Sequence, residues 1–256
     1  MKAFYKTLTS MIGAVAMTGA LFSAPAYSEE TTVRVGTEPS FAPFEFMDEK
    51  TKELTGFDID LINAIGKASG FKVEMHTMPF DGIIPAILTG SLDAALSAFT
   101  ITDERKKRVD FSEPYYKAGL GVIIRNAVKD KVKSVDDLKG MKLCGQIGTS
   151  GAMYASKIEG ATVTQFNTAP ETYLELRKGG CDAVINDRPV HAYYMATVRP
   201  DDLTLLPDYV TAEDYGIVMS KSEPEIEKLI NDGLAKIHAD GTYDKIYKKW
   251  FGDAAE

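Results

Sequence analysis

The chain has 256 residues, of which 45% are hydrophobic and 26% are charged, and its formal net charge is −8. This length and hydrophobic fraction exclude a disordered or collagen-like chain and suit one large domain or two ordinary ones. The acidic balance argues against nucleic acid as a partner, because phosphate contacts need clustered lysine and arginine. Two cysteines are too few for a disulfide scaffold or a four-ligand zinc site.

Residues 1–28 have the parts of a secretory signal peptide. Lys2 and Lys6 precede an apolar run over residues 11–22, and small residues follow. The run is shorter than the ~20 residues that span a bilayer, and a buried N-terminal helix is the alternative interpretation. We expect cleavage before Glu29, or two residues earlier. Without the two lysines, 27 basic and 37 acidic residues remain, a net charge of −10.

Export changes what the cysteines indicate. Cys144 and Cys181 would lie in an oxidising compartment, where a pair more often forms a disulfide than serves catalysis. The three histidines are scattered, and the sequence has no HExxH or comparable ligand spacing. We therefore expect no metal, no cofactor and no catalytic residue.

The first half of the mature chain alternates short runs rich in valine and isoleucine with amphipathic stretches. This pattern predicts two helices between three strands, an order that implies a parallel sheet with right-handed crossovers. The strands are expected at 33–36, 72–78 and 93–99, and the helices at 57–69 and from the cap Asp81 to Gly90, with Pro85 in the first turn.

The same order restarts about 105–110 residues later. Strands are expected at 142–146, 162–166 and 182–186, helices from 150 and over 170–178, extended runs at 119–125 and 215–220, and final helices at 223–239 and 242–250. Two such units joined by two extended crossings predict two lobes with a cleft between them. Ligands of open α/β sheets bind beyond the carboxyl ends of the strands, so the candidate site lies there.

Polar and aromatic side chains follow the strand ends of the first unit. Glu38 and Phe41 follow the first strand, and Phe80 follows the second. After the third, Thr102 can cap a helix that brings Arg105 within one turn of the strand end. A guanidinium matches a carboxylate with two parallel hydrogen bonds. The alternatives are a solvated helix charge for the arginine and simple packing in a surface turn for the loop aromatics.

The second unit offers complementary groups. The loop over residues 146–151 contains two glycines, so its backbone N–H groups can face an anion at the start of a helix. The loop lacks the phosphate-binding pattern GxxxxGK[ST], and a carboxylate is an equally suitable ligand. Asp187 ends the third strand and is a candidate partner for an ammonium group, with helix capping as its alternative role.

These groups together suit a zwitterion. Its carboxylate would bind Arg105 and the loop amides, and its ammonium would bind Asp187. The two loop aromatics would flank an aliphatic stem, leaving Glu38 and Gln146 to meet the far end of a side chain. The strand ends therefore predict an amino-acid site.

Several motifs lie in register along residues 33–252: GFDIDL at 56–61, FDGIIPA at 80–86, ITDER at 101–105, DFS at 110–112, PYY at 114–116 and DGTY at 240–243. Together they resemble one protein family, the periplasmic solute-binding proteins of polar amino-acid ABC transporters (family 3). The resemblance is greatest to glutamine-binding and to histidine- or lysine-arginine-ornithine-binding proteins.

The resemblance implies a two-lobed periplasmic-binding-protein fold of the Venus-flytrap type (type II). Each lobe would be a mostly parallel sheet flanked by helices, with two hinge strands between the lobes. The expected segments are lobe 1 at 29–117 and 217–256, lobe 2 at 118–216, and hinge crossings near 118–121 and 211–216. The implied function is a periplasmic receptor that binds a polar or cationic L-amino acid and delivers it to an inner-membrane ABC permease.

On matching positions the resemblance implies a divided set of ligand contacts. Arg105 and the backbone amides of Thr100 and Ser150 would bind the α-carboxylate, and Asp187, the Ala98 carbonyl and the Thr100 hydroxyl would hold the α-ammonium. The complete expected ligand-binding set is Glu38, Phe41, Phe80, Ala98, Thr100, Arg105, Gln146, Thr149, Ser150 and Asp187.

Three positions depart from the glutamine binders that this chain resembles. Those proteins carry lysine where Gln146 stands and histidine where Asn186 stands, and Glu38 is longer than their usual aspartate. The departures leave arginine, lysine and histidine open as ligands beside glutamine.

The resemblance also bears on the cysteines and on the competing functions. In the sheet order of this family the strands near Cys144 and Cys181 are neighbours, which predicts a disulfide, with two buried thiols as the alternative. A periplasmic enzyme similar to cyclohexadienyl dehydratase is the alternative function, and it would need a general acid, for which Glu38 is the evident carboxylate. We expect a binding protein and not an enzyme, and a monomer.

Overall fold

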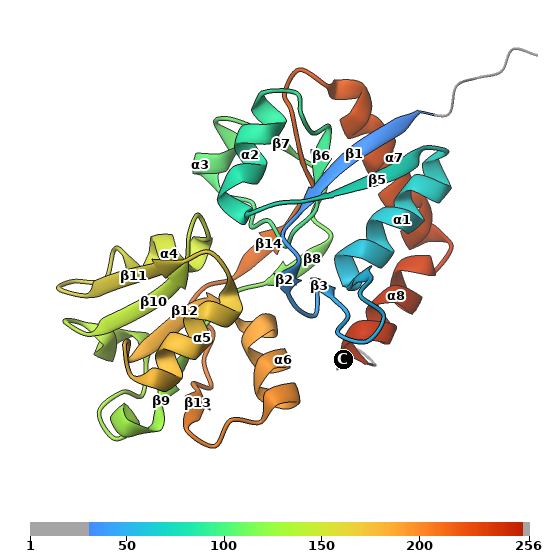
Figure 1. The fold of residues 1–256 in the computed structure, drawn as a ribbon. Coiled ribbons are helices and arrows are strands. Elements are labelled where there is room, and N and C mark those ends of the chain that lie inside the picture. The colour runs from blue at the N-terminus through green and yellow to red at the C-terminus, as the bar shows by residue number, and fades with distance from the viewer. Residues whose placement is uncertain (1–30, 253–256) are drawn as a thin grey trace, which may run out of the picture.

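The computed structural model describes residues 31–252, and the predicted signal peptide lies outside them. Within this range the chain forms two lobes, each built on a five-stranded sheet with helices on both faces (Figure 1). The predicted two-lobed fold is therefore confirmed. None of the helices in the described range is long and apolar enough to cross a membrane.

The sheet of the first lobe has the strand order β5-β1-β6-β15-β7. Its strands are β1 Thr32–Thr37, β5 Lys72–Thr77, β6 Ala94–Ala95, β7 Asp110–Phe111 and β15 Val218–Met219. The first three strands pair in parallel, whereas β15 is antiparallel to both of its neighbours. A small sheet of β2 Ser40–Phe41, β3 Glu45–Met47 and β4 Leu54–Thr55 precedes the first helix.

The helices of the first lobe are α1 Phe57–Ser69, α2 Phe80–Leu88, α3 Asp103–Lys106, α7 Pro224–Ala239 and α8 Thr242–Phe251. All but the short α3 pack an apolar face against the core of this lobe. Helix α1 has the predicted bounds and ends at Gly70, whose φ of 76° suits glycine. The C-terminal helices return to this lobe, as Figure 1 shows, where Trp250 donates from Nε1 to Asp60 at 2.7 Å.

The second lobe repeats the plan with the strand order β11-β10-β12-β9-β13. Its strands are β9 Leu120–Arg125, β10 Lys142–Gln146, β11 Thr162–Phe166, β12 Ala183–Asp187 and β13 Leu203–Leu205. Its helices are α4 Ser150–Ala155, α5 Ala169–Lys178 and α6 Arg188–Val198, with 3₁₀ turns at Asn126–Val128 and Val135–Leu138. Strands β10, β11 and β12 are parallel, and β9 is antiparallel to both of its neighbours.

Two short strands run between the lobes. Strand β8 (Tyr116–Ala118) pairs antiparallel with β14 (Glu213–Tyr215), and Figure 1 shows the pair at the junction. The two extended runs that were expected to cross between the lobes lie largely within the sheets. Residues 120–125 form β9, and residues 218–219 form β15. Both sheets are consequently mixed, with parallel and antiparallel pairs.

Three local predictions need correction. Helix α2 begins at Phe80 after Pro79, so Asp81 is not its cap, and Pro85 lies inside the helix. The strand expected over 93–99 is reduced to β6, because Ala98 has a φ of +46° and leaves the extended conformation. Helix α6 was not predicted at all, although a proline in its first turn is a helix-start signal.

A disulfide joins Cys144 and Cys181 in the second lobe. Strands β10 and β12 are parallel neighbours, as the resemblance implies, and the two Cα atoms are 5.9 Å apart. This distance lies within the range that a disulfide spans. The predicted disulfide is confirmed in the structure, and it holds together the strands whose carboxyl ends face the first lobe.

Candidate functional site

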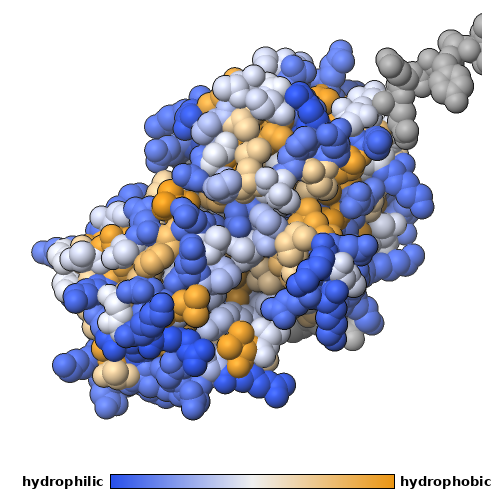
Figure 2. Space-filling view, viewed as in Figure 1, coloured by the Kyte–Doolittle hydropathy of each residue, from blue (hydrophilic) through white to orange (hydrophobic). Residues whose placement is uncertain are grey.

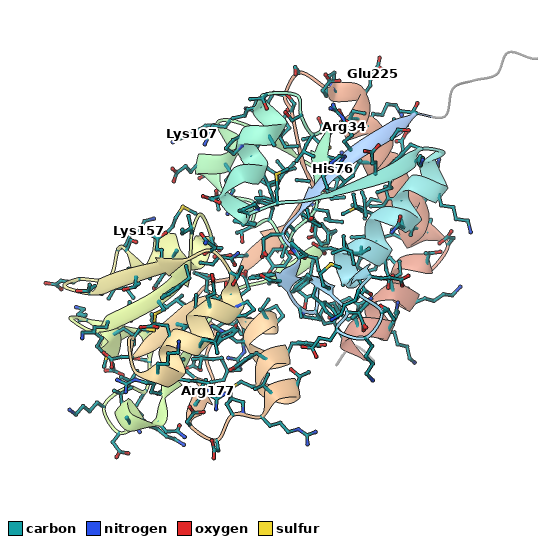
Figure 3. The ribbon with its side chains drawn as sticks, in the orientation of Figure 1. Arg34, His76, Lys107, Lys157, Arg177 and Glu225 are labelled. Atoms are coloured by element: carbon teal, nitrogen blue, oxygen red, sulfur yellow. A yellow bond between two sulfur atoms is a disulfide. The ribbon has the colours of Figure 1, made fainter. Side chains whose placement is uncertain are left out.

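A cavity lies between the lobes at the carboxyl ends of the parallel strands. Figure 2 shows the lobes in contact, and in Figure 3 side chains from both lobes fill the space between them. All ten residues of the predicted ligand-binding set line this cavity, and two further residues, Glu45 and Ser97, join them.

Arg105 reaches the cavity from α3, whose start is fixed by a cap. The Thr102 hydroxyl accepts the backbone N–H of Arg105 at 3.2 Å, as expected from the sequence. The guanidinium is 7% exposed and lies over the rings of Phe80 and Phe99, whose centroids are 5.5 and 5.2 Å from Cζ. Burial lowers the pKa of Arg105 to about 10, so the group stays charged at neutral pH.

The same guanidinium contacts both lobes. Nη1 donates to the Thr100 carbonyl at 2.7 Å, and Nη2 donates to the Gly148 carbonyl in the second lobe at 3.0 Å. These bonds use two of its five N–H donors, which leaves three for a ligand. Gly148 has a φ of +78°, and a Cβ there would lie 3.3 Å from Cβ of Asp81 in the first lobe. A glycine at this position therefore permits the close approach of the lobes.

Asp187 faces the cavity from the end of β12. It occupies the cap position of α6, yet no cap hydrogen bond from its side chain is found within the described chain. The residue is 3% exposed, and no donor in the range 31–252 reaches its Oδ1. Burial and, next, the charge of Glu213 raise the pKa of Asp187 to about 8. The side chain is thus a buried acceptor that a cation would stabilise as a carboxylate.

Thr100 and Ser150 bring the two lobes together at the floor of the cavity. Their hydroxyl oxygens are 3.2 Å apart, and both residues are buried. Ser150 begins α4, which Thr149 caps by accepting the Ala152 N–H at 3.2 Å. Ala98 reaches the lining through its left-handed conformation.

The opposite end of the cavity is formed by Glu38 and Gln146. Nε2 of Gln146 donates to Oε2 of Glu38 at 3.2 Å, which joins the second lobe to the first. The Ser40 hydroxyl lies 2.7 and 2.8 Å from the two carboxyl oxygens of Glu38. Burial raises the pKa of Glu38 above its ordinary value, and Phe41 lines the same cavity from β2.

Sequence reasoning missed a buried acidic pair, of which Glu45 lines the cavity and Asp58 does not. Glu45 is fully buried and accepts the Ser97 hydroxyl at 2.7 Å, while Asp58 accepts the Ala98 N–H at 2.8 Å and the Tyr115 hydroxyl at 2.9 Å. Burial and the neighbouring charge of Asp58 hold the pKa of Glu45 well above its ordinary value. The available signal was a lone acid between two phenylalanines, at the first position of a short strand.

Sequence reasoning also missed Glu213, which lies on the crossing strand β14. Its Oε2 accepts the hydroxyls of Thr100 at 2.9 Å and Ser150 at 3.1 Å, one from each lobe. No sequence pattern near residue 213 indicates a binding site, and this segment was expected only as a crossing between the lobes.

The cavity is chemically asymmetric. Among the lining residues within 31–252, Glu38, Glu45 and Asp187 are acidic and Arg105 is basic. The arrangement can bind an anionic group at the guanidinium and cationic groups at the acids. In the same range, no three histidine, cysteine or acidic side chains are placed to hold a metal ion.

Comparison with known proteins agrees with this geometry. The family of bacterial extracellular solute-binding proteins, family 3, matches residues 33–253. A probable histidine-binding protein of Neisseria gonorrhoeae is 39% identical over 90% of this chain and 86% of its own length. The ABC transporter glutamine-binding protein GlnH of Bacillus subtilis is 34% identical over 88% and 83%. A solved ancestral arginine-binding protein bound to arginine is 42% identical, with a TM-score of 0.83 over 87% of this chain and 99% of its own.

Proposed function

Because this chain belongs to the bacterial extracellular solute-binding proteins of family 3, we propose that it binds a polar or cationic L-amino acid between its lobes and delivers it to an ABC transporter permease. The observation that carries this proposal is the cavity between the lobes, which a buried guanidinium and buried carboxyls line together. Like its named relatives, it is a binding protein and not an enzyme.

The backbone of the ligand would be held at the floor of the cavity. Arg105 has three N–H donors left after its bonds to two carbonyls, and it is the proposed clamp for the α-carboxylate, with the amides of Thr100 and Ser150. Asp187, with the Ala98 carbonyl and the Thr100 hydroxyl, would hold the α-ammonium. A buried carboxyl without a hydrogen-bond donor from the described residues at Oδ1 supports this role of Asp187.

The side chain of the ligand would extend toward Glu38 and Gln146. Phe41 and Phe80 line the intervening space and can contact an aliphatic stem. Burial without a cationic partner disfavours the charged form of Glu38, and a cationic ligand would supply that partner. Because Arg105 and Asp187 are assigned to the α-carboxylate and α-ammonium, Glu38 remains for the side chain, which favours arginine, lysine or histidine over a neutral ligand.

Closure of the lobes follows from how these contacts are divided. Arg105, Thr100 and Glu38 come from the first lobe, whereas Gln146, Ser150 and Asp187 come from the second. A ligand that touches both sets binds the closed form more tightly than the open form, so it shifts the equilibrium toward closure. The β8–β14 pair is the proposed hinge for this motion.

Delivery and location rest on the family. Its members are extracellular, and one relative is named as the binding protein of an ABC transporter. We assign this chain to the periplasm, as a monomer that presents its closed form to an inner-membrane permease.

The test is calorimetry on protein that has been unfolded and refolded to remove co-purified ligand, titrated with each common amino acid. We expect binding of at least one among arginine, lysine, histidine and glutamine, with the cationic ones tighter. Absence of binding by every amino acid would refute the proposal. Turnover of prephenate or arogenate in a parallel assay would instead establish an enzyme related to cyclohexadienyl dehydratase.

A further inference from the structure

Glu213 lies on the crossing strand β14 and touches the cavity only through other residues. Its Oε2 accepts one hydroxyl from each lobe, that of Thr100 at 2.9 Å and that of Ser150 at 3.1 Å. Thr100 and Ser150 line the cavity, whereas Glu213 lies behind them. The two bonds coexist only in a closed form, because they join residues of different lobes.

The carboxylate is anchored at the junction by its other oxygen. Oε1 of Glu213 accepts the Thr211 hydroxyl at 3.0 Å, and that hydroxyl oxygen accepts the N–H of Leu120, the first residue of β9, at 2.9 Å. A chain of hydrogen bonds thus runs from the start of the second sheet, through the crossing, to the floor of the cavity.

These bonds fix the direction of two hydroxyl hydrogens. A hydroxyl has one hydrogen to donate and two lone pairs to accept with. A carboxylate oxygen only accepts, so Thr100 and Ser150 each donate that hydrogen to Glu213 and not across the 3.2 Å between their own oxygens, and only lone pairs remain for a ligand. Lone pairs attract an ammonium and repel a carboxylate.

We propose that Glu213 is a positioning residue that turns the hydroxyls of Thr100 and Ser150 into acceptors for the α-ammonium of the ligand as the lobes close. The inference rests on the proposed function, since it concerns how that site recognises an amino acid. It adds to the site a residue on the crossing strand that makes no direct contact with the ligand.

The test compares an amino acid with the same molecule without its α-amino group. The probe is the amino acid of the panel above that binds most tightly, paired with 5-guanidinopentanoate for arginine, 6-aminohexanoate for lysine, imidazolepropionate for histidine or 4-carbamoylbutanoate for glutamine. For Glu213→Ala, calorimetry should show a loss of about tenfold or more for the amino acid, because a hydrogen bond to a charged group is weakened, and less than threefold for the analogue.

Two variants separate positioning from a structural role. Glu213→Gln keeps an oxygen that accepts both hydroxyls, so it should restore most of the affinity lost in Glu213→Ala. Asp214→Ala, at the exposed next position of the same strand, is the matched control and should change neither affinity.

Equal losses for the amino acid and the analogue in Glu213→Ala would overturn the inference, because they would mean that Glu213 only holds the lobes together. A Glu213→Gln variant as weak as Glu213→Ala would overturn it as well. If the wild-type protein binds an amino acid and the Glu213 variants match it, the inference alone fails. Absence of amino-acid binding by the wild type would mean that the proposed function itself fails.

Discussion

Replacing Arg105 with alanine removes the guanidinium proposed to hold the α-carboxylate. In the wild type this side chain is 7% exposed, and two aromatic rings cover it. The variant would bring the ligand carboxylate into the same buried place without its cationic partner. Leaving a buried charge unpaired costs about 3–5 kcal/mol, and each 1.4 kcal/mol is tenfold in affinity. The expected loss is therefore about 100- to 4,000-fold.

We expect a loss of affinity near the lower end of this range. The backbone amides of Thr100 and Ser150 would still donate to the carboxylate and offset part of the loss. Arg105→Lys should fall between wild type and alanine, because an ammonium keeps the charge but lacks the planar fork that two carboxylate oxygens match.

The assay is calorimetric titration of ligand-free protein, with thermal unfolding to show that each variant folds. Lys106→Ala is the matched control, since Lys106 is the exposed next residue of the same helix. The reasoning is refuted if Arg105→Ala, folded as the wild type is, binds its amino acid within threefold of the wild-type affinity.

Three other predictions concern selectivity, proton linkage and stability. Glu38→Gln should weaken arginine or lysine about tenfold and glutamine little, because it removes one charge–charge contact; titrations showing equal losses would exclude Glu38 as the selector. Asp187 has a pKa raised to about 8 by burial, and a bound ammonium lowers that pKa. Binding at pH 7 should therefore release protons and tighten as pH rises toward 8, which titrations in buffers of different ionisation enthalpy measure; proton uptake would contradict the assignment. Cys144→Ala with Cys181→Ala removes a link between residues 37 apart and should lower the free energy of unfolding by ~4 kcal/mol in urea denaturation. An unchanged urea midpoint would contradict this prediction.

Short sequence patterns predicted two kinds of element correctly. They are helices, whose hydrogen bonds lie within one segment, and strands whose buried residues recur over a few positions. Helix α1 has its predicted bounds because apolar residues recur at helical spacing and Gly70 supplies the left-handed stop. Strands β10 and β11 likewise match their predicted ranges. The cap at Thr102, which places Arg105 at a strand end, depends on residues three apart and was readable for the same reason.

Such patterns did not predict which strands pair in each sheet. A period of two shows that a segment is extended, but its partners are chosen by backbone hydrogen bonds to residues far along the chain. The run at 119–125 was expected as a crossing and is β9 of the second sheet, antiparallel to β12. Ala98 leaves the extended conformation, and its N–H bonds Asp58, a residue forty positions earlier.

The candidate site divides along the same line. The sequence by itself predicted the charged residues Glu38, Arg105 and Asp187 as lining residues. Each lies at or just after the end of a predicted strand, and the carboxyl ends of parallel strands meet at one edge of a sheet. Glu45 and Glu213 were decided only by the tertiary structure. Their roles depend on residues that are 50 or more positions away. Glu45 meets Ser97 when the first lobe folds, and Glu213 meets both Thr100 and Ser150 only when the two lobes and the crossing strand pack together.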